Sequence, residues 1–129
     1  MTDMILVYIT CESVEQAKKF GRHLLEKRLC ACVNIFSNMH PMFWWPPKEN
    51  KIDESEEVVL IAKTLESKYQ ALEDEVHKIH TYETPCVFAI PITLKTACIA
   101  AEDVRGGSGV HPLDVIDQGL LNSVTGCPQ

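Results

Sequence analysis

The order of apolar segments along the chain constrains its fold more than any other feature of the sequence. Short runs rich in β-branched, aromatic and aliphatic residues occupy positions 4–10, 31–36, 58–62 and 86–92. Their length and composition are typical of strands. A stretch with helical periodicity follows the first run, and a second one follows the third run. We therefore expect the order strand, helix, strand, strand, helix, strand.

Both helical stretches carry start or stop signals. Ser13 and Gln16 form a capping-box pattern, in which the hydroxyl accepts a backbone N–H and the amide side chain reaches back. Lys27, near the end of this helix, opposes the negative pole of the helix dipole. Thr64 is predicted to cap the second helix. The apolar stripe of that helix is Leu65, Tyr69, Leu72, Val76 and Ile79.

This order is the split β-α-β-β-α-β pattern and predicts an α+β, ferredoxin-like sandwich. Two helices would cover one face of an antiparallel sheet. Because the strands contain few polar residues, we expect another subunit to cover the other face. Residues 1–105 are assigned to this domain. The pattern fails after Lys95, and the glycine-rich start of residues 106–129 predicts a flexible C-terminal tail.

Charge and composition exclude several kinds of partner. Lys and Arg number 12 against 18 Asp and Glu, which gives a net charge of -6. This balance disfavours nucleic acid and anionic membranes, which reward clustered cations. No apolar run approaches the roughly 18 residues of a membrane span, and the N-terminus lacks the basic region of a signal peptide. We therefore expect a cytoplasmic protein with no nucleic-acid or membrane partner.

Motifs of common enzymes are missing from the sequence. There is no G-x-S-x-G, no phosphate-binding Walker loop and no G-x-G-x-x-G after a strand. The six cysteines match neither a zinc CxxC pair nor a redox CxxC, so most are expected to be buried thiols. The sequence therefore favours a binding protein over an enzyme.

Two longer motifs are more specific. Residues 26–34 read Glu-Lys-Arg-Leu-Cys-Ala-Cys-Val-Asn, and residues 80–85 read His-Thr-Tyr-Glu-Thr-Pro. Phe43 and Trp45 precede a Lys-Ile pair at 51–52. In this combination, over about residues 4–95, the chain resembles the divalent-cation tolerance (CutA-type) family.

The resemblance implies a ferredoxin-like fold in which long β-hairpins join three subunits into a stable homotrimer. Members are linked to tolerance of copper and other divalent metals, and animal members to the anchoring of acetylcholinesterase. No enzymatic activity is implied. The expected partners are therefore further copies of this chain, a divalent metal such as copper that is not required for folding, and a possible protein partner.

Some positions depart from the family pattern. Thr81 stands where the family has proline, and Asn50 stands where glycine is usual before Lys51. Residues 46–48, Pro-Pro-Lys, look inserted in the turn between Trp45 and Lys51. Beyond Lys95 the chain does not follow the family's aromatic-rich closing helix.

The family's copper site is only partly retained. The resemblance places its first-strand cysteine on Ile9 and its adjacent histidines on Ile79 and His80. An isoleucine cannot ligate metal, so the candidate ligands are His77 and His80, spaced i,i+3 on one helix face, together with Cys11. The alternative is a structural or surface role, because a protonated histidine stabilises a helix C-terminus.

A second candidate site is a ligand cleft formed by Lys63, His80, Tyr82 and Glu83. An ammonium group, a phenol and a carboxylate together would bind a small anion or a metal complex at a subunit boundary. The alternative is that Lys63 pairs with Glu83 and that Tyr82 packs against a neighbour with its hydroxyl hydrogen-bonded.

An aromatic cluster precedes the proline pair. Phe43, Trp44 and Trp45 are predicted to lie at an oligomer interface, where such residues are enriched. A stacking platform for a ligand is the alternative. Overall, the sequence predicts a non-enzymatic homotrimer that binds metal or a small ligand in divalent-cation tolerance. A structural interaction module for a protein partner and a PII-like sensor of small molecules are the alternatives.

Overall fold

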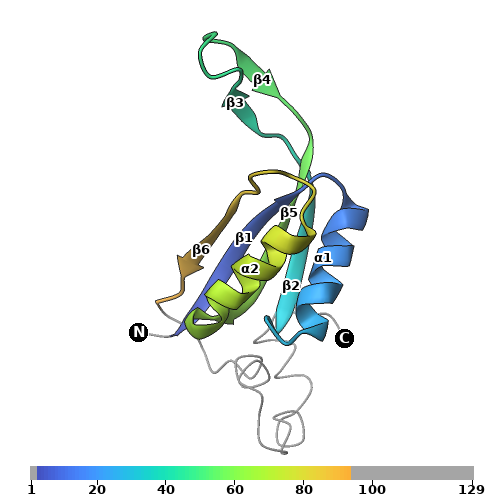
Figure 1. The fold of residues 1–129 in the computed structure, drawn as a ribbon, viewed down its shortest axis with the longest axis vertical. Coiled ribbons are helices and arrows are strands. Elements are labelled where there is room, and N and C mark those ends of the chain that lie inside the picture. The colour runs from blue at the N-terminus through green and yellow to red at the C-terminus, as the bar shows by residue number, and fades with distance from the viewer. Residues whose placement is uncertain (1–2, 94–129) are drawn as a thin grey trace, which may run out of the picture.

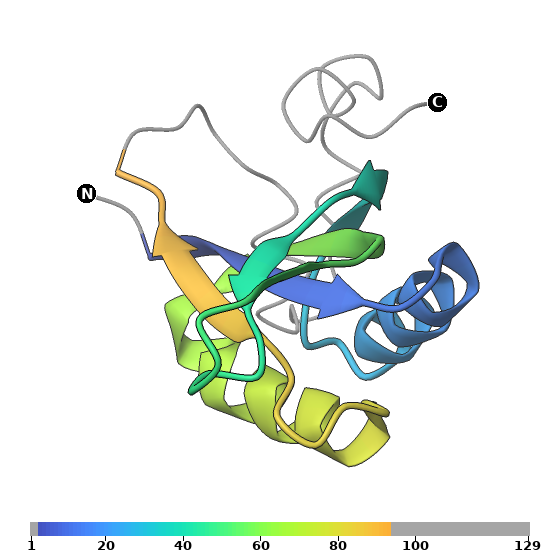
Figure 2. The same ribbon diagram turned by 90° about the horizontal axis from the view of Figure 1, so that it is seen from above.

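The computed structural model describes residues 3–93, which form a four-stranded sheet, two helices and a separate hairpin (Figure 1). The elements are β1 (Met4–Cys11), α1 (Val14–Glu26), β2 (Cys32–Met39), β3 (Met42–Trp44), β4 (Ile52–Glu54), β5 (Glu57–Leu65), a 3-10 turn (Glu66–Lys68), α2 (Tyr69–Ile79) and β6 (Val87–Pro91). The sheet order is β2-β5-β1-β6, with every neighbouring pair antiparallel. Figure 2 shows both helices on the same side of the sheet, which confirms the predicted α+β fold. The predicted tail, residues 106–129, and the end of the predicted domain lie outside the described residues.

The core lies between the sheet and the helices. Side chains alternate between the two faces of each strand. Val7 and Ile9 of β1 and Leu60 and Ala62 of β5 point to the helices and are fully buried. The helices complete the core with Phe20, Leu24, Leu72 and Val76. No helix within residues 3–93 is long and apolar enough to cross a lipid bilayer.

The predicted cap of α1 is confirmed. Ser13 Oγ accepts the backbone N–H of Gln16 at 3.0 Å. The side chain of Gln16 reaches back to the backbone N–H of Glu12, one residue before the cap, at 2.8 Å. Halfway along the helix, a Cβ atom on Gly21 would lie 2.9 Å from Val33 Cγ2. The glycine therefore allows α1 to pack closely on β2.

The predicted cap of the second helix is wrong. Thr64 lies within β5, because the pairing of β5 with β1 continues to Leu65 opposite Met4. Its hydroxyl is fully buried and donates to the carbonyl of Leu29 at 2.7 Å. The helix begins only after the 3-10 turn, and no side chain caps it. Leu65, predicted to begin the helical stripe, is instead the last residue of the strand.

The hairpin formed by β3 and β4 projects away from the sandwich (Figure 1). Residues 45–51 connect the two strands, so the proline pair lies in a turn. The hairpin contacts little of its own chain and exposes large apolar side chains. An isolated two-stranded hairpin is marginally stable in water. The apolar residues it exposes are Met42, Phe43, Trp44, Trp45 and Ile52.

The buried hydroxyl of Thr64 provides a test of the fold. We expect Thr64→Val to lower the free energy of unfolding by about 1–3 kcal/mol, because it leaves the carbonyl of Leu29 without its donor. Urea unfolding at fixed protein concentration measures this change. The control is Ser67→Ala in the exposed 3-10 turn. Equal effects of the two substitutions would contradict a role for this hydrogen bond.

Candidate functional site

The sheet face opposite the helices, which we call the open face, is largely apolar. Phe36 of β2 is 54% exposed, and Phe88 and Ile90 of β6 are 45% and 42% exposed. Tyr8 pairs with Ile61 on one side and with Phe88 on the other, and its ring stacks on Phe88 with centroids 4.7 Å apart. The register assigns to the open face Leu6, Tyr8, Asn34, Phe36, Ile61, Lys63, Phe88 and Ile90, together with the buried residues Thr10, Cys32 and Val59.

His80 connects the end of α2 to β1, at a point that we call the corner. Its backbone N–H closes the helix on the carbonyl of Val76 at 2.8 Å. Its Nδ1 accepts the backbone N–H of Tyr82 at 3.0 Å, and its Nε2 lies 2.7 Å from the carbonyl of Thr10. A backbone amide only donates and a carbonyl only accepts, so these bonds assign the neutral tautomer with the proton on Nε2. The ring also packs against Phe20, with centroids 5.0 Å apart.

Thr81 adds a further bond at this corner. Its Oγ1 accepts a hydrogen bond from Gln16 Nε2 at 2.8 Å. Gln16 is also part of the cap of α1, so the loop after α2 is tied to the start of α1. The residue that replaces the expected proline therefore contributes an interaction that proline cannot make.

A cavity of about 460 Å³ lies where the base of the hairpin meets the sheet, and we call it the hairpin-base cavity. It is lined by Tyr8, Thr10, Met39, Pro41, Phe43, Glu57, Tyr82, Thr84 and Cys86. Tyr82 Oη donates to Glu57 Oε1 at 3.1 Å. His80 positions the backbone of Tyr82, so the corner and the cavity form one connected site.

Burial and the charge of Glu57 act together on the titratable groups of the cavity. Burial, and then the charge of Glu57, raises the pKa of Tyr82 to about 12. Burial also raises the pKa of Tyr8, where Cys86 and Glu57 add to the effect. The pKa of Cys86 is raised by burial and by Glu57. The tyrosines and the thiol therefore remain protonated at neutral pH around a single carboxylate.

The predicted metal ligands are not brought together. His80 is the C-cap residue of α2, and its imidazole is held against the carbonyl of Thr10 and the ring of Phe20. His77 is exposed, and its Nε2 lies 3.6 Å from Glu73 Oε1. Cys11 is fully buried on the helix side of the sheet, and burial, with a smaller effect of nearby acidic groups, raises its thiol pKa to about 12. Within residues 3–93, no three His, Cys, Asp or Glu side chains are grouped so as to hold a metal ion.

The two isoleucines at the family's copper positions have packing roles. Ile9 is fully buried in the main core, and Ile79 packs against the same core from the end of α2. Apolar side chains at both positions therefore contribute to the contact between β1 and α2. The residues that the structure describes here do not fit a copper ion bound in the family's manner.

The predicted ligand cleft is only partly assembled. Lys63 pairs with Leu6 of β1. Leu6 lies four residues before Thr10, which is about 13 Å along the strand. The structure therefore does not bring Lys63 to the corner that His80 and Tyr82 form. Glu83 is exposed and does not line the cavity.

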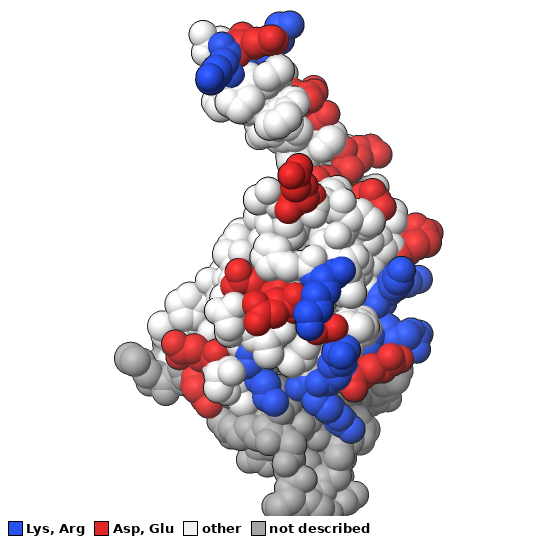
Figure 3. Space-filling model, in the orientation of Figure 1, with Lys and Arg blue, Asp and Glu red and all other residues white. Residues whose placement is uncertain are grey.

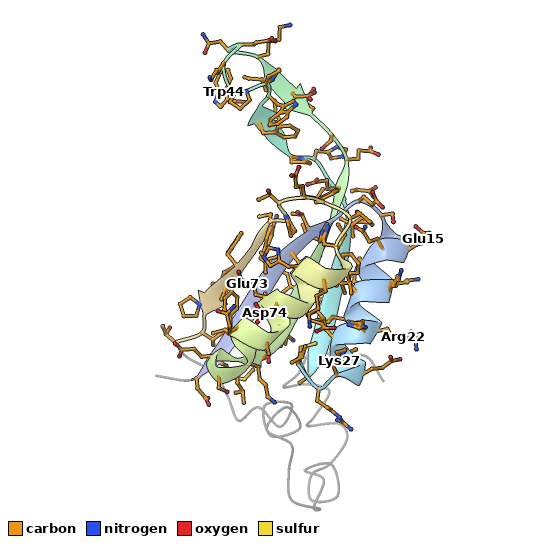
Figure 4. All side chains as sticks on the ribbon, in the orientation of Figure 1. Glu15, Arg22, Lys27, Trp44, Glu73 and Asp74 are labelled. Carbon is orange, nitrogen blue, oxygen red and sulfur yellow. The ribbon has the colours of Figure 1, made fainter. Side chains whose placement is uncertain are left out.

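Sequence reasoning missed three residues of this site. Glu57, Tyr8 and Cys86 meet at the cavity although they come from β5, β1 and the position just before β6. Tyr8 gave the only usable signal, since it is a polar-ended aromatic residue within an otherwise aliphatic strand. Trp44, one of the predicted interface residues, lies on the projecting hairpin (Figure 4). It is 61% exposed and is therefore accessible to another subunit.

These features define a ferredoxin-like α+β domain with one uncovered sheet face and a projecting aromatic hairpin. The model of the CutA1 divalent ion tolerance protein family matches residues 5–98. The chain therefore belongs to the divalent-cation tolerance family, as its motifs predicted.

Individual relatives agree with this assignment. The divalent-cation tolerance protein CutA of Archaeoglobus fulgidus is 46% identical over 86 residues, which are 67% of this chain and 80% of the relative. The protein of the same name from Thermotoga maritima is 43% identical over 89 residues, 69% of this chain and 84% of that protein. The crystal structure of CutA1 from Ehrlichia chaffeensis superposes with a TM-score of 0.68 at 33% identity, covering 74% of this chain and 87% of that one.

Hydrogen exchange tests the role of His80. In His80→Ala we expect the amide of Tyr82 to exchange about tenfold faster or more, because it loses its acceptor on the ring. His77→Ala, which alters an exposed residue of α2, is the control and should leave this amide unchanged. NMR-detected exchange at neutral pH provides the measurement. Unchanged protection of Tyr82 in His80→Ala would show that the ring does not hold the loop.

Proposed function

We propose that three copies of this chain assemble through the open face and the hairpin, and that the trimer acts in divalent-cation tolerance as a binding protein without catalysing a reaction. The observation that carries this proposal is the large apolar surface that the described residues leave uncovered. Exposed aromatic and aliphatic side chains run from the open face onto the hairpin. Monomeric proteins seldom expose a contiguous apolar patch of this kind.

The energetics favour burial of this surface. Covering a large apolar side chain stabilises by about 1.5–3 kcal/mol. Phe36 and Phe88 on the open face and Trp44 on the hairpin would each contribute on this scale. A second copy of the same chain supplies matching apolar surface, and a closed ring repeats that contact for every copy.

Metal binding is the finer part of the proposal. His77, His80 and Cys11 remain the predicted ligands, and the structure adds two costs to their use. Metal at His80 Nδ1 must displace the backbone N–H of Tyr82. Metal at Cys11 must remove a proton from a thiol whose pKa burial has raised to about 12. Binding is therefore expected to release protons and to strengthen as the pH rises.

A cytoplasmic location also belongs to the proposal. The cysteines Cys11, Cys30, Cys32 and Cys86 are all free thiols, which suits a reducing compartment. A protein that presents a rigid trimer to a protein partner is the second candidate function. It is favoured by the hairpin, whose exposed aromatic residues would provide an interaction surface if assembly leaves them uncovered.

Tryptophan fluorescence tests the proposed interface. The chain has two tryptophans, and both lie at the hairpin. We expect Phe88→Glu to shift their emission to the red. A charge on the open face opposes assembly, and without assembly the tryptophans of the hairpin are exposed to water. Leu25→Glu, on the exposed side of α1, is the control and should emit like the wild type. Identical, fully red-shifted emission from all three proteins would contradict the interface.

Calorimetric titration with Cu(II) and Cu(I) tests the metal hypothesis. We expect one copper ion per subunit, taken up more tightly at higher pH, and loss of that uptake in the double variant His77→Ala/His80→Ala. The control is His40→Ala in the exposed segment between β2 and β3, which should bind as the wild type does. Uptake that the double variant leaves unchanged would remove these ligands from consideration and favour the interaction module.

A further inference from the structure

The hairpin-base cavity combines aromatic rings with a single carboxylate. Tyr8 of β1, Phe43 of β3 and Tyr82 of the loop after α2 contribute the rings, and Glu57 contributes the only carboxylate. Among the residues that the structure describes, no lysine, arginine or histidine lines the cavity. Its volume of about 460 Å³ lies within the range typical of small-molecule sites.

The carboxylate of Glu57 has no cationic partner among residues 3–93. Its Oε1 accepts the hydroxyl of Tyr82, and none of the ion pairs in this part of the chain includes it. Figure 3 shows further acidic side chains along the stalk of the hairpin, whereas Lys and Arg lie at its tip and lower on the sandwich. These acidic side chains add negative charge near the base of the hairpin.

Three classes of ligand fit this lining poorly. An anion would meet the charge of Glu57 with no compensating base. A divalent metal ion needs several charged or oxygen ligands, and the described residues place no group of three His, Cys, Asp or Glu side chains here or elsewhere. A neutral apolar molecule would remove water from the carboxylate without compensation.

An organic cation fits all of these features. Its positive charge would pair with Glu57, and its alkyl groups would contact the ring faces, whose quadrupole attracts cations. We propose that the hairpin-base cavity binds a small alkylammonium ion, with the nitrogen near Glu57 and the carbon atoms against Tyr8, Phe43 and Tyr82. This ligand class goes beyond the proposed function and does not depend on metal binding.

A free ligand suits the cavity better than a lysine from a neighbouring copy. A lysine ammonium on its narrow stem would fill only a small part of about 460 Å³. A compact ion with several alkyl groups would contact the three rings together. The two sources share the same chemistry, and the experiment separates them.

Titration of the purified, full-length protein in its assembled state tests the proposal. The probe is tetramethylammonium chloride, and tert-butanol is its neutral counterpart of similar shape. We expect saturable uptake of tetramethylammonium alone, and NMR contacts between its methyl protons and the rings of Tyr8 and Tyr82. Glu57→Gln keeps an oxygen for the Tyr82 hydroxyl and should weaken binding at least about tenfold. Glu56→Gln, one residue earlier and outside the cavity lining, should bind as the wild type does.

Three results would overturn the proposal. The first is the absence of saturable uptake, and the second is equal binding of tert-butanol. The third is a Glu57→Gln variant that remains folded and binds the ion unchanged. If Glu57→Gln instead loosens the assembly while the wild type takes up no probe, the cavity belongs to a side chain of a neighbouring copy and the free-ligand proposal fails. Sedimentation reports the assembly separately, so failure of this proposal is distinguishable from failure of the proposed trimer.

Discussion

The apolar character of both faces of β1 and β5 is the constraint on which the rest of the structure depends. The two helices cover one face, where Val7, Ile9 and Leu60 are fully buried. On the other face, Tyr8 and Ile61 continue the apolar surface and remain partly exposed. A sheet of this kind is stable in water only when a second layer covers it. The helices of the chain thus cover one face of the sheet, and association with other copies would cover the second face.

The corner at His80 links this packing to the cavity. The imidazole joins the carbonyl of Thr10 to the amide of Tyr82, which in turn brings its hydroxyl to Glu57. The end of α2, the central strand and the base of the hairpin are therefore connected through a chain of hydrogen bonds. A motif that resembles a metal-binding remnant thus has a structural role here that requires no ion. Isoleucines at positions 9 and 79 are consistent with that role, since both pack on the core.

Sequence reasoning predicted the strands and helices because their side-chain periodicities are local. It failed at Thr64, where a hydroxyl before a helical pattern resembles a cap but the strand pairing continues past it. The spacing of His77 and His80 also did not reveal their surroundings, because the imidazole of His80 is held by the Thr10 carbonyl and Phe20 whereas His77 is exposed beside Glu73. The cavity could not be predicted, since Tyr8, Glu57 and Tyr82 are far apart in sequence and meet only through the sheet register and the loop after α2.

The mass of the unmodified protein in solution tests the central claim, that copies of this chain cover the open face. Sedimentation equilibrium over a range of protein concentrations gives that mass without altering any residue. The account predicts three times the 14.5 kDa of one chain, maintained on dilution. A mass of one chain throughout that range would contradict it, because the open face and the hairpin would then remain in water.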